Sequence, residues 1–157
     1  MIHQARRDEF LISTDTALMD IDFIHQELAG VYWSTGIPRE TVRRGIENSI
    51  AFGVYDTATG SPRQVGFARV ISDRATFAYL SDVFVVGAYR GRGLGRWLVE
   101  VILAHPDLQG LRRFCLLTRD AHGLYSKFGF KPMPDASRYM ELWDPEVYTR
   151  KRCAIWP

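Results

Sequence analysis

The chain contains little cysteine, since Cys115 and Cys153 are its two thiols among 157 residues. Two cysteines without a recognisable spacing are too few for a disulfide framework or a cysteine metal site, so we expect no bound metal. An excess of one charge is also missing, because 20 basic and 18 acidic residues leave a formal net charge of +2. Proteins that bind nucleic acid usually carry a strongly basic stripe, so this balance predicts no nucleic acid partner.

Long apolar segments are absent as well. No apolar run approaches the ~20 residues that cross a bilayer, and residues 1–7 lack the apolar stretch of a signal peptide. These features predict no membrane partner and a cytoplasmic location. With 46% hydrophobic and 13% aromatic residues, the chain has enough apolar material for one folded domain with a core and a ligand cavity.

Residues 1–50 are predicted to form one strand and two helices. The strand is expected over 10–13, the first helix over 20–30, and the second helix from Pro38, because a proline in the first turn loses no hydrogen bond. Both helices carry apolar residues at helical spacing, namely Ile21, Ile24 and Leu28 in the first and Val42, Ile46 and Ile50 in the second. Each helix therefore has one face to bury.

The remainder of the chain alternates between strands and helices. β-Branched and aromatic residues predict three consecutive strands over 51–55, 64–71 and 76–86, which would form an antiparallel meander. The elements expected after them are a helix over 93–104, a strand over 114–117, a helix over 121–128 and a last strand over 139–143. The order β-α-α-β-β-β-α-β-α-β indicates an α+β fold with three layers (α/β/α) around a mixed, mostly antiparallel sheet.

A glycine-rich turn lies where a buried strand is followed by a helix, and its sequence is Arg90-Gly91-Arg92-Gly93-Leu94-Gly95. Glycines let the backbone approach a ligand closely, and a helix N-terminus offers free N–H donors with a favourable dipole. Arg90, Arg92 and Arg96 add positive charge at the same point. The pattern favours a phosphate or pyrophosphate site, and the alternative is a turn that merely connects strand to helix.

Two other phosphate-binding loops do not fit this turn. A P-loop needs Gly-Lys-Ser/Thr, whereas this chain has Gly95-Arg96-Trp97. A dinucleotide fingerprint aligned on Gly91 and Gly93 would need glycine where Arg96 stands, and it prefers an initial βαβ unit rather than a meander. Both classes are therefore excluded.

The turn resembles the coenzyme A motif of the GNAT family of N-acetyltransferases, Arg/Gln-x-x-Gly-x-Gly/Ala, which Arg90, Gly93 and Gly95 match in order. A second signature of that family, a helix with a tyrosine followed by Gly-Phe, resembles the segment Leu124 to Phe130. The resemblance implies that amides from Gly91 to Arg96 hold the pyrophosphate of acetyl-CoA. It also implies that the backbone of Val83, Phe84 and Val85 pairs with the pantetheine arm like an added strand.

The same resemblance implies one acetyl-CoA-binding N-acetyltransferase domain over residues 1–157. Residues 1–50 would supply acceptor-side helices, residues 51–143 the cofactor-binding core and residues 144–157 a tail that ends near Trp156. Acetyl-CoA would be the cosubstrate, without a metal. Because members of the family often dimerise, a homodimer is compatible with the resemblance.

Tyr125 is the candidate general acid, since the family's tyrosine protonates the leaving thiolate and a phenol is a neutral donor at pH 7. The alternative is an aromatic residue that packs on the sheet with its hydroxyl at the surface. Many members also place an asparagine before this tyrosine, in contact with the cofactor. Residues 118–123 of this chain have none, so Asp120 or His122 would have to cover that contact, or nothing does.

Asp82 is the candidate general base, directly or through water, because it stands beside the expected thioester site where the family's central strand commonly splays open. It could instead bind a cationic substrate, or it could cap a local bulge. His122 is a weaker candidate base, although histidine titrates in the useful range. His3, His25 and His105 have no partner spacing, so no chemistry is assigned to them.

The acceptor is expected to be a primary amine on a small molecule that attacks the thioester directly, with strand amides near Val83 and Phe84 polarising the carbonyl. Phe23, Tyr32 and Trp33 could form an aromatic wall that holds an apolar acceptor, or an ammonium by cation–π contact, although core packing explains Phe23 better. The alternatives are acetylation of a protein N-terminus or lysine, and a coenzyme A-binding sensor module without catalysis. A nucleic-acid-binding domain that uses the arginine cluster is disfavoured by the balanced charge.

Overall fold

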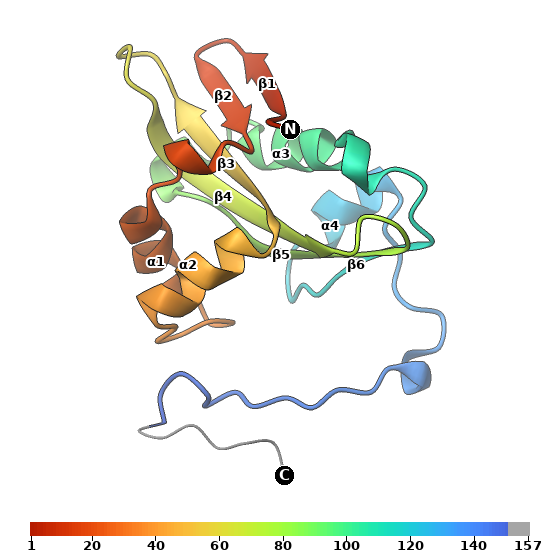
Figure 1. The fold of residues 1–157 in the computed structure, drawn as a ribbon. Helices are drawn as coiled ribbons and strands as arrows, with labels where there is room; N and C mark the ends of the chain where they lie inside the picture. The colour runs from red at the N-terminus through yellow and green to blue at the C-terminus, as the bar shows by residue number, and fades with distance from the viewer. Residues whose placement is uncertain (151–157) are drawn as a thin grey trace.

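The computed structural model describes residues 1–150, and a six-stranded sheet runs through its centre (Figure 1). The strands lie side by side in chain order: β1 (Gln4–Arg7), β2 (Phe10–Ser13), β3 (Ile50–Asp56), β4 (Arg63–Ser72), β5 (Phe77–Val85) and β6 (Arg113–Leu116). Each neighbouring pair from β1 to β5 is antiparallel, and β6 runs parallel to β5. The expectation of a mixed, mostly antiparallel sheet is therefore confirmed.

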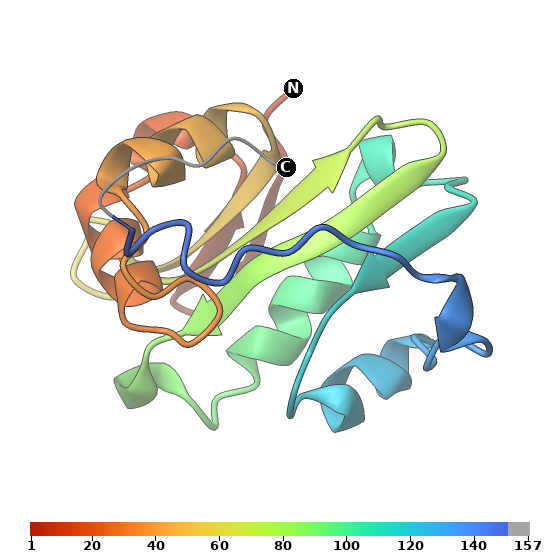
Figure 2. The ribbon, with the colours of Figure 1, turned by 90° about the horizontal axis from the view of Figure 1, so that it is seen from below.

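Four α-helices cover the two faces of this sheet (Figure 2). Helices α1 (Ile21–Ala29) and α2 (Arg39–Glu47) lie on one face, whereas α3 (Leu94–Leu103) and the short α4 (His122–Tyr125) lie on the other. Asp20 caps α1 by accepting a hydrogen bond of 2.9 Å from the amide of Phe23, and Pro38 precedes the first residue of α2. The three-layer α/β/α arrangement is confirmed. In the described part of the chain, no helix is long and apolar enough to cross a bilayer.

Two separate apolar cores form because the sheet has a helical layer on each side. The larger core joins α3 and Tyr125 of α4 to the sheet and contains eighteen buried residues, including Phe52, Leu98 and Ile102. The smaller core lies under α1 and α2 and contains eight, including Leu28 and Phe67. Along β5 the side chains of Val83 and Val85 pack against the larger core and that of Phe84 packs against the smaller one, as the alternation of a strand requires.

Strand β5 bends at a β-bulge. Phe67 of β4 lies opposite Phe84, but Arg69 lies opposite Ser81, so two residues of β5 face one residue of β4. Asp82 is the residue at the bulge and has a φ of 56°, in the left-handed region that few non-glycine residues occupy. The sheet also opens here, because β6 pairs with β5 only as far as Leu80.

Two sequence-based expectations differ from the structure. Residues 4–7 form the additional strand β1, which pairs with β2 as a hairpin. The expectation of a last strand over 139–143 is wrong. This segment is exposed and crosses beneath the domain away from β6 (Figure 1). A strand needs the hydrogen-bonding groups of a neighbouring edge, and the prolines at 132 and 134 precede the departure of the chain from the sheet. Residues 151–157, with Cys153 and Trp156 of the expected tail, lie outside the described residues.

Candidate functional site

The open edge of β5 is the centre of the candidate site. Beyond Leu80 no described strand pairs with β5 on the side of β6, so the backbone from Ser81 to Val85 borders the widening gap between these strands. An exposed strand edge can accept an extended ligand by backbone hydrogen bonding. The segment predicted to bind the pantetheine arm, Val83 to Val85, is therefore at such an edge.

The glycine-rich turn follows β5 and leads into α3. Gly91 and Gly93 have φ of 78° and 74°, the left-handed conformation that glycine adopts without strain. A Cβ added at Gly91 or Gly95 would meet no atom within 4 Å, so the backbone faces open space. The amides of Leu94, Gly95 and Arg96 donate to no described backbone carbonyl. Unsatisfied donors at the N-terminus of a ten-residue helix fit a pyrophosphate.

The three arginines of the turn are held differently. Arg90 donates from Nε to the carbonyl oxygen of Val85 at 3.1 Å, and the Arg92 guanidinium lies 5.1 Å from the ring centre of Tyr89. Arg96 forms an ion pair of 3.0 Å with Glu100. The side chain of Leu94 is buried in the larger core, so only its backbone can serve a ligand.

Arg7 of β1 adds a fourth arginine next to the turn. Its Nη2 donates to the Arg92 carbonyl oxygen at 3.4 Å, and its guanidinium lies 4.8 Å from the ring centre of Trp97. No local pattern places Arg7 here, because its partners Arg92 and Trp97 are 85 and 90 residues away along the chain.

Tyr125 ends helix α4 on the face of the larger core. Its ring packs edge to face on Phe130, with 6.0 Å between ring centres, and burial raises the pKa of its phenol above the usual value. The phenol is therefore protonated at neutral pH, as a proton donor must be. Its hydroxyl has no hydrogen-bond partner among residues 1–150. Asp120 and His122 are exposed just before this residue.

Asp82 lies on the opposite face, where the bulge turns it toward α2. Its Oδ2 accepts a hydrogen bond from Nε of Arg69 in a close ion pair. The side chains are 8% exposed for Asp82 and 22% for Arg69, so the pair is largely removed from solvent. The buried carboxylate of Asp82 therefore lies at the bulge of β5. Oδ1 of Asp82 has no partner within the described chain.

A pocket of about 430 Å³ opens beside this ion pair, between α2, the end of α1 and strands β4 and β5. This volume suits a small molecule. Its polar lining comes from Thr41, Arg44, Asn48, Arg69 and Asp82, and its apolar lining includes Leu28, Val42, Phe67 and Tyr148. Asp82 is therefore the one predicted site residue that lines this pocket.

The three aromatic residues predicted to form an acceptor wall divide into two groups. Tyr32 and Trp33 contact each other edge to face at 4.9 Å between ring centres, and both are exposed. Phe23 instead packs on Phe84 at 5.9 Å and borders a second pocket of about 610 Å³ that Val86 and Tyr89 also line. The structure thus brings Tyr32 and Trp33 together but places Phe23 with β5.

Arg119 connects two loops of the protein. Its guanidinium lies 3.9 Å from the ring centre of Tyr32, so the segment after β6 contacts the loop between α1 and α2. The cation–π contact that was expected for a ligand is thus occupied by the protein itself.

Five residues of the site were not predicted from the sequence: Arg7, Arg44, Arg69, Arg119 and Tyr148. Arg69 had a signal, because a charge within the apolar strand sequence Phe67-Ala68-Arg69-Val70 requires a partner when it is buried. The other four had none, since their positions depend on contacts between distant segments. No group of three or more metal-ligating side chains is found in the described chain.

Comparison with known proteins identifies a family. Residues 48–132 match the family model of the acetyltransferase (GNAT) domain. A candidate GNAT acetyltransferase from Xanthomonas campestris pv. campestris has a solved structure that is 46% identical, with a TM-score of 0.83, covering 96% of this chain and 98% of that one. A candidate acetyltransferase from Gibberella zeae is 35% identical over 140 residues, 77% of this chain and 78% of the relative. The chloroplastic serotonin N-acetyltransferase 2 of Oryza sativa subsp. japonica is 31% identical over 139 residues, 85% and 68% of the two chains.

Proposed function

This chain belongs to the GNAT family of acetyltransferases, and on that premise we propose that it transfers an acetyl group from acetyl-CoA to a primary amine of a small molecule. The observation that carries the proposal is the geometry of β5. The open edge of this strand leads to the glycine-rich turn, and its bulge places Asp82 in a pocket of about 430 Å³. One strand therefore connects a cofactor site to an acceptor site.

The residues of the turn fit the cofactor that this family generally uses. The free amides of Leu94, Gly95 and Arg96 would bind the pyrophosphate, supported by Arg90, Arg92 and Arg7. The edge of β5 at Val83 to Val85 would hold the pantetheine arm. Acetyl-CoA supplies an activated thioester carbonyl, and the strand amides near Phe84 would stabilise the oxyanion that develops on it.

Acyl transfer to an alkylammonium requires two protons to leave the nitrogen and one to reach the sulfur. An alkylammonium has a pKa of about 10, so the amine must first be deprotonated. Asp82 would accept this proton directly or through water, using the oxygen that Arg69 leaves free. The amine nitrogen then forms a bond to the carbonyl carbon as the carbon–sulfur bond breaks. Tyr125 would donate its phenolic proton to the thiolate, and the second proton, which the nitrogen loses as the amide forms, would restore the phenol.

The size and lining of the pocket support a small acceptor. A cavity of about 430 Å³ falls in the range of small-molecule sites, and its walls combine aromatic, apolar and charged groups. A relative of this chain is named for the acetylation of serotonin, a small aromatic amine. Both points favour a small amine over a protein lysine.

The activity is tested by mixing the protein with acetyl-CoA, a panel of amines and a thiol reagent, with mass spectrometry of the products. Release of thiol that depends on the amine is the expected result. Binding of acetyl-CoA without thiol release on any amine would instead support a non-catalytic sensor.

A substitution at Gly95 tests the cofactor site without straining the backbone. Unlike Gly91 and Gly93, Gly95 has no positive φ, and its Cβ position is open. Gly95→Trp should therefore fold but fill the turn and weaken acetyl-CoA binding at least tenfold, whereas Gly95→Ala should bind nearly as wild type. Unchanged affinity in the tryptophan variant, measured by calorimetry, would remove the turn from the cofactor site.

A further inference from the structure

Helix α2 carries three arginines, and they differ in whether an acidic side chain pairs with them. Arg39 pairs with Asp22 of α1. Arg43 is held between Glu40 and Glu47, with Nε donating to Glu40 at 2.9 Å. Arg44, the next residue, forms no side-chain hydrogen bond or ion pair within residues 1–150. One cation of this helix therefore has no ion-pair partner among the described residues.

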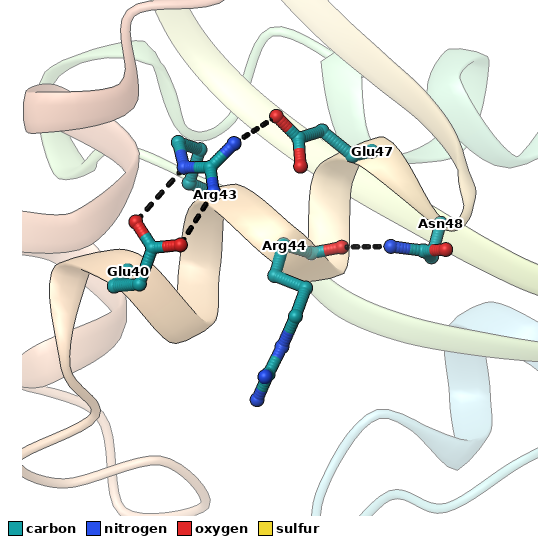
Figure 3. Close-up of polar contacts among 5 residues, drawn as sticks. All are labelled: Glu40, Arg43, Arg44, Glu47 and Asn48. Carbon is teal, nitrogen blue, oxygen red and sulfur yellow. Dashed lines mark hydrogen bonds and ion pairs between the residues drawn. The ribbon is translucent and has the colours of Figure 1, made fainter.

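The two neighbouring arginines leave the helix on different sides (Figure 3). The guanidinium of Arg43 lies between its two glutamates, whereas the side chain of Arg44 extends away from them. Glu40 is close enough for Arg44 to contribute a lesser part to the lowering of its pKa, yet its carboxylate pairs with Arg43. The glutamates of α2 thus leave Arg44 available to a ligand.

Arg44 lines the pocket that also contains Asp82. Arg69 and Asp82 neutralise each other across their ion pair, so the guanidinium of Arg44 is the excess charge among the described residues of the lining. Gly45 contributes no side chain to the adjacent pocket wall, and a Cβ there would lie 3.7 Å from the Arg69 guanidinium. Asn48 donates to the Arg44 carbonyl oxygen at 2.8 Å and fixes the end of the helix. The pocket is therefore positive at the end formed by α2.

We propose that the acceptor carries an anionic group, a carboxylate or a phosphate, on the same small molecule as its amine, and that Arg44 binds this group. The inference rests on the proposed acetyltransferase function and specifies the acceptor. A guanidinium forms paired, charge-assisted hydrogen bonds with carboxylates and phosphates. Leu28, Val42 and Phe67 also line the pocket, so they would contact an apolar group on the same molecule. An amino acid with an apolar side chain has this chemistry.

Matched substrate pairs test the proposal. Phenylalanine is compared with phenethylamine, and phosphoethanolamine with ethanolamine, so that the two pairs distinguish a carboxylate from a phosphate. We expect kcat/KM to be about 10- to 100-fold higher for the anionic member of at least one pair, since hydrogen bonds to charged groups contribute on that scale. Equal kcat/KM within both pairs, or preference for the neutral amines, would overturn the proposal.

Arg44→Gln and its neighbour Arg43→Gln form a matched pair of variants. Arg44→Gln should raise KM for the anionic substrate about tenfold or more and affect the neutral amine much less, whereas Arg43→Gln should keep the wild-type preference. Comparing variants within one substrate pair cancels the different basicity of the two amines. If Arg44→Gln impaired both members equally, or if Arg43→Gln abolished the preference as well, the anion would not be bound by Arg44.

A binding measurement keeps this proposal separate from the catalytic one. N-acetylphenylalanine and its neutral amide are titrated by calorimetry into the wild type and into Arg44→Gln, with N-acetylphosphoethanolamine as the phosphate probe. Tighter binding of an acid than of the neutral amide, lost in Arg44→Gln, would support the anion site even if no amine is acetylated. Equal binding of all three probes to the wild type would refute the anion site while leaving the acetyltransferase function intact.

Discussion

The two faces of the central sheet are built for different purposes. The face under α3 and α4 is a continuous apolar core of eighteen buried residues. The face under α1 and α2 has a smaller core of eight, and beside it lie the buried ion pair of Arg69 with Asp82 and a pocket of about 430 Å³. Buried charge and empty volume both reduce stability, because desolvation and missing contacts carry a free-energy cost. The first face therefore stabilises the fold, and the second contains the proposed acceptor site.

Strand β5 belongs to both faces, which explains how they cooperate. Val83 and Val85 are anchored in the larger core, whereas Phe84 and Asp82 face the helices α1 and α2. A site that needs fixed geometry is best placed on a rigid element. The dense core thus holds the backbone of β5 in place for the more open face.

The sharpest test of the comparison is the same substitution on each face. Leu98→Ala in the larger core should lower the free energy of unfolding by about 2–5 kcal/mol, because Leu98 is fully buried and does not line this pocket. Leu28→Ala should cost less, since Leu28 already borders the pocket and so lacks neighbours on one side. Urea unfolding measures both. Equal losses would mean that the two faces are equally well packed.

Tyr125→Phe tests whether the stabilising face also contributes one chemical group. Removing the hydroxyl leaves the ring and its contact with Phe130, so the unfolding free energy and the acetyl-CoA affinity should change little. The turnover number should fall about 100-fold, equivalent to about 2.7 kcal/mol, because a general acid contributes on that scale. Wild-type turnover in steady-state assays would return Tyr125 to a purely structural role.

Arg69→Met measures the free-energy cost of an unpaired buried charge on the face under α1 and α2. It leaves the Asp82 carboxylate without its guanidinium, and we expect a loss of about 1–3 kcal/mol in unfolding free energy. Adding Asp82→Asn should recover part of this loss, as a double-mutant cycle would show. Arg39→Met is the control, because the pair of Arg39 with Asp22 is exposed and should contribute less than about 1 kcal/mol.

The smallest expected effect is a pH dependence that originates in the larger core. Burial lowers the pKa of His105 below its usual value of about 6.5, and its Nδ1 accepts a hydrogen bond from the Asp107 amide only when neutral. The unfolded chain therefore binds a proton before the folded chain does. Stability is complete above pH 6.5 and falls as the pH drops from there to the folded pKa.

His105→Gln should flatten the profile of unfolding free energy against pH by at most one proton, or about 1.4 kcal/mol per pH unit. The exposed His122 provides the control, and His122→Gln should leave the slope unchanged. A slope that is equally steep in both variants would place the titrating group elsewhere.

The sequence predicted best what depends on local patterns. Ile24 and Leu28, spaced for one helix face, are buried beneath α1, and Gly91 and Gly93 adopt the left-handed conformation that a close turn requires. Hydrophobic periodicity and glycine placement are local properties, so they can be read without knowing the fold.

What escaped prediction depends on contacts between distant segments. The run Tyr139 to Trp143 has strand propensity, but it formed no strand because no edge lies beside it. Arg69 and Asp82 are 13 residues apart and meet across the register shift of β4 and β5, which spacing alone does not specify. Tyr148 reaches the pocket from beyond the sheet and carried no signal in the sequence.

The exposed segment over 139–143 predicts how the protein behaves at high concentration. Met140, Leu142 and Trp143 are 91%, 72% and 73% exposed, and the outer edge of β6 pairs with no described strand. The strand-prone apolar segment of one copy can pair with the open β6 edge of a second copy, although the two do not pair within one copy. We expect the sedimentation coefficient to rise with protein concentration, and Met140→Lys with Leu142→Lys to suppress that rise.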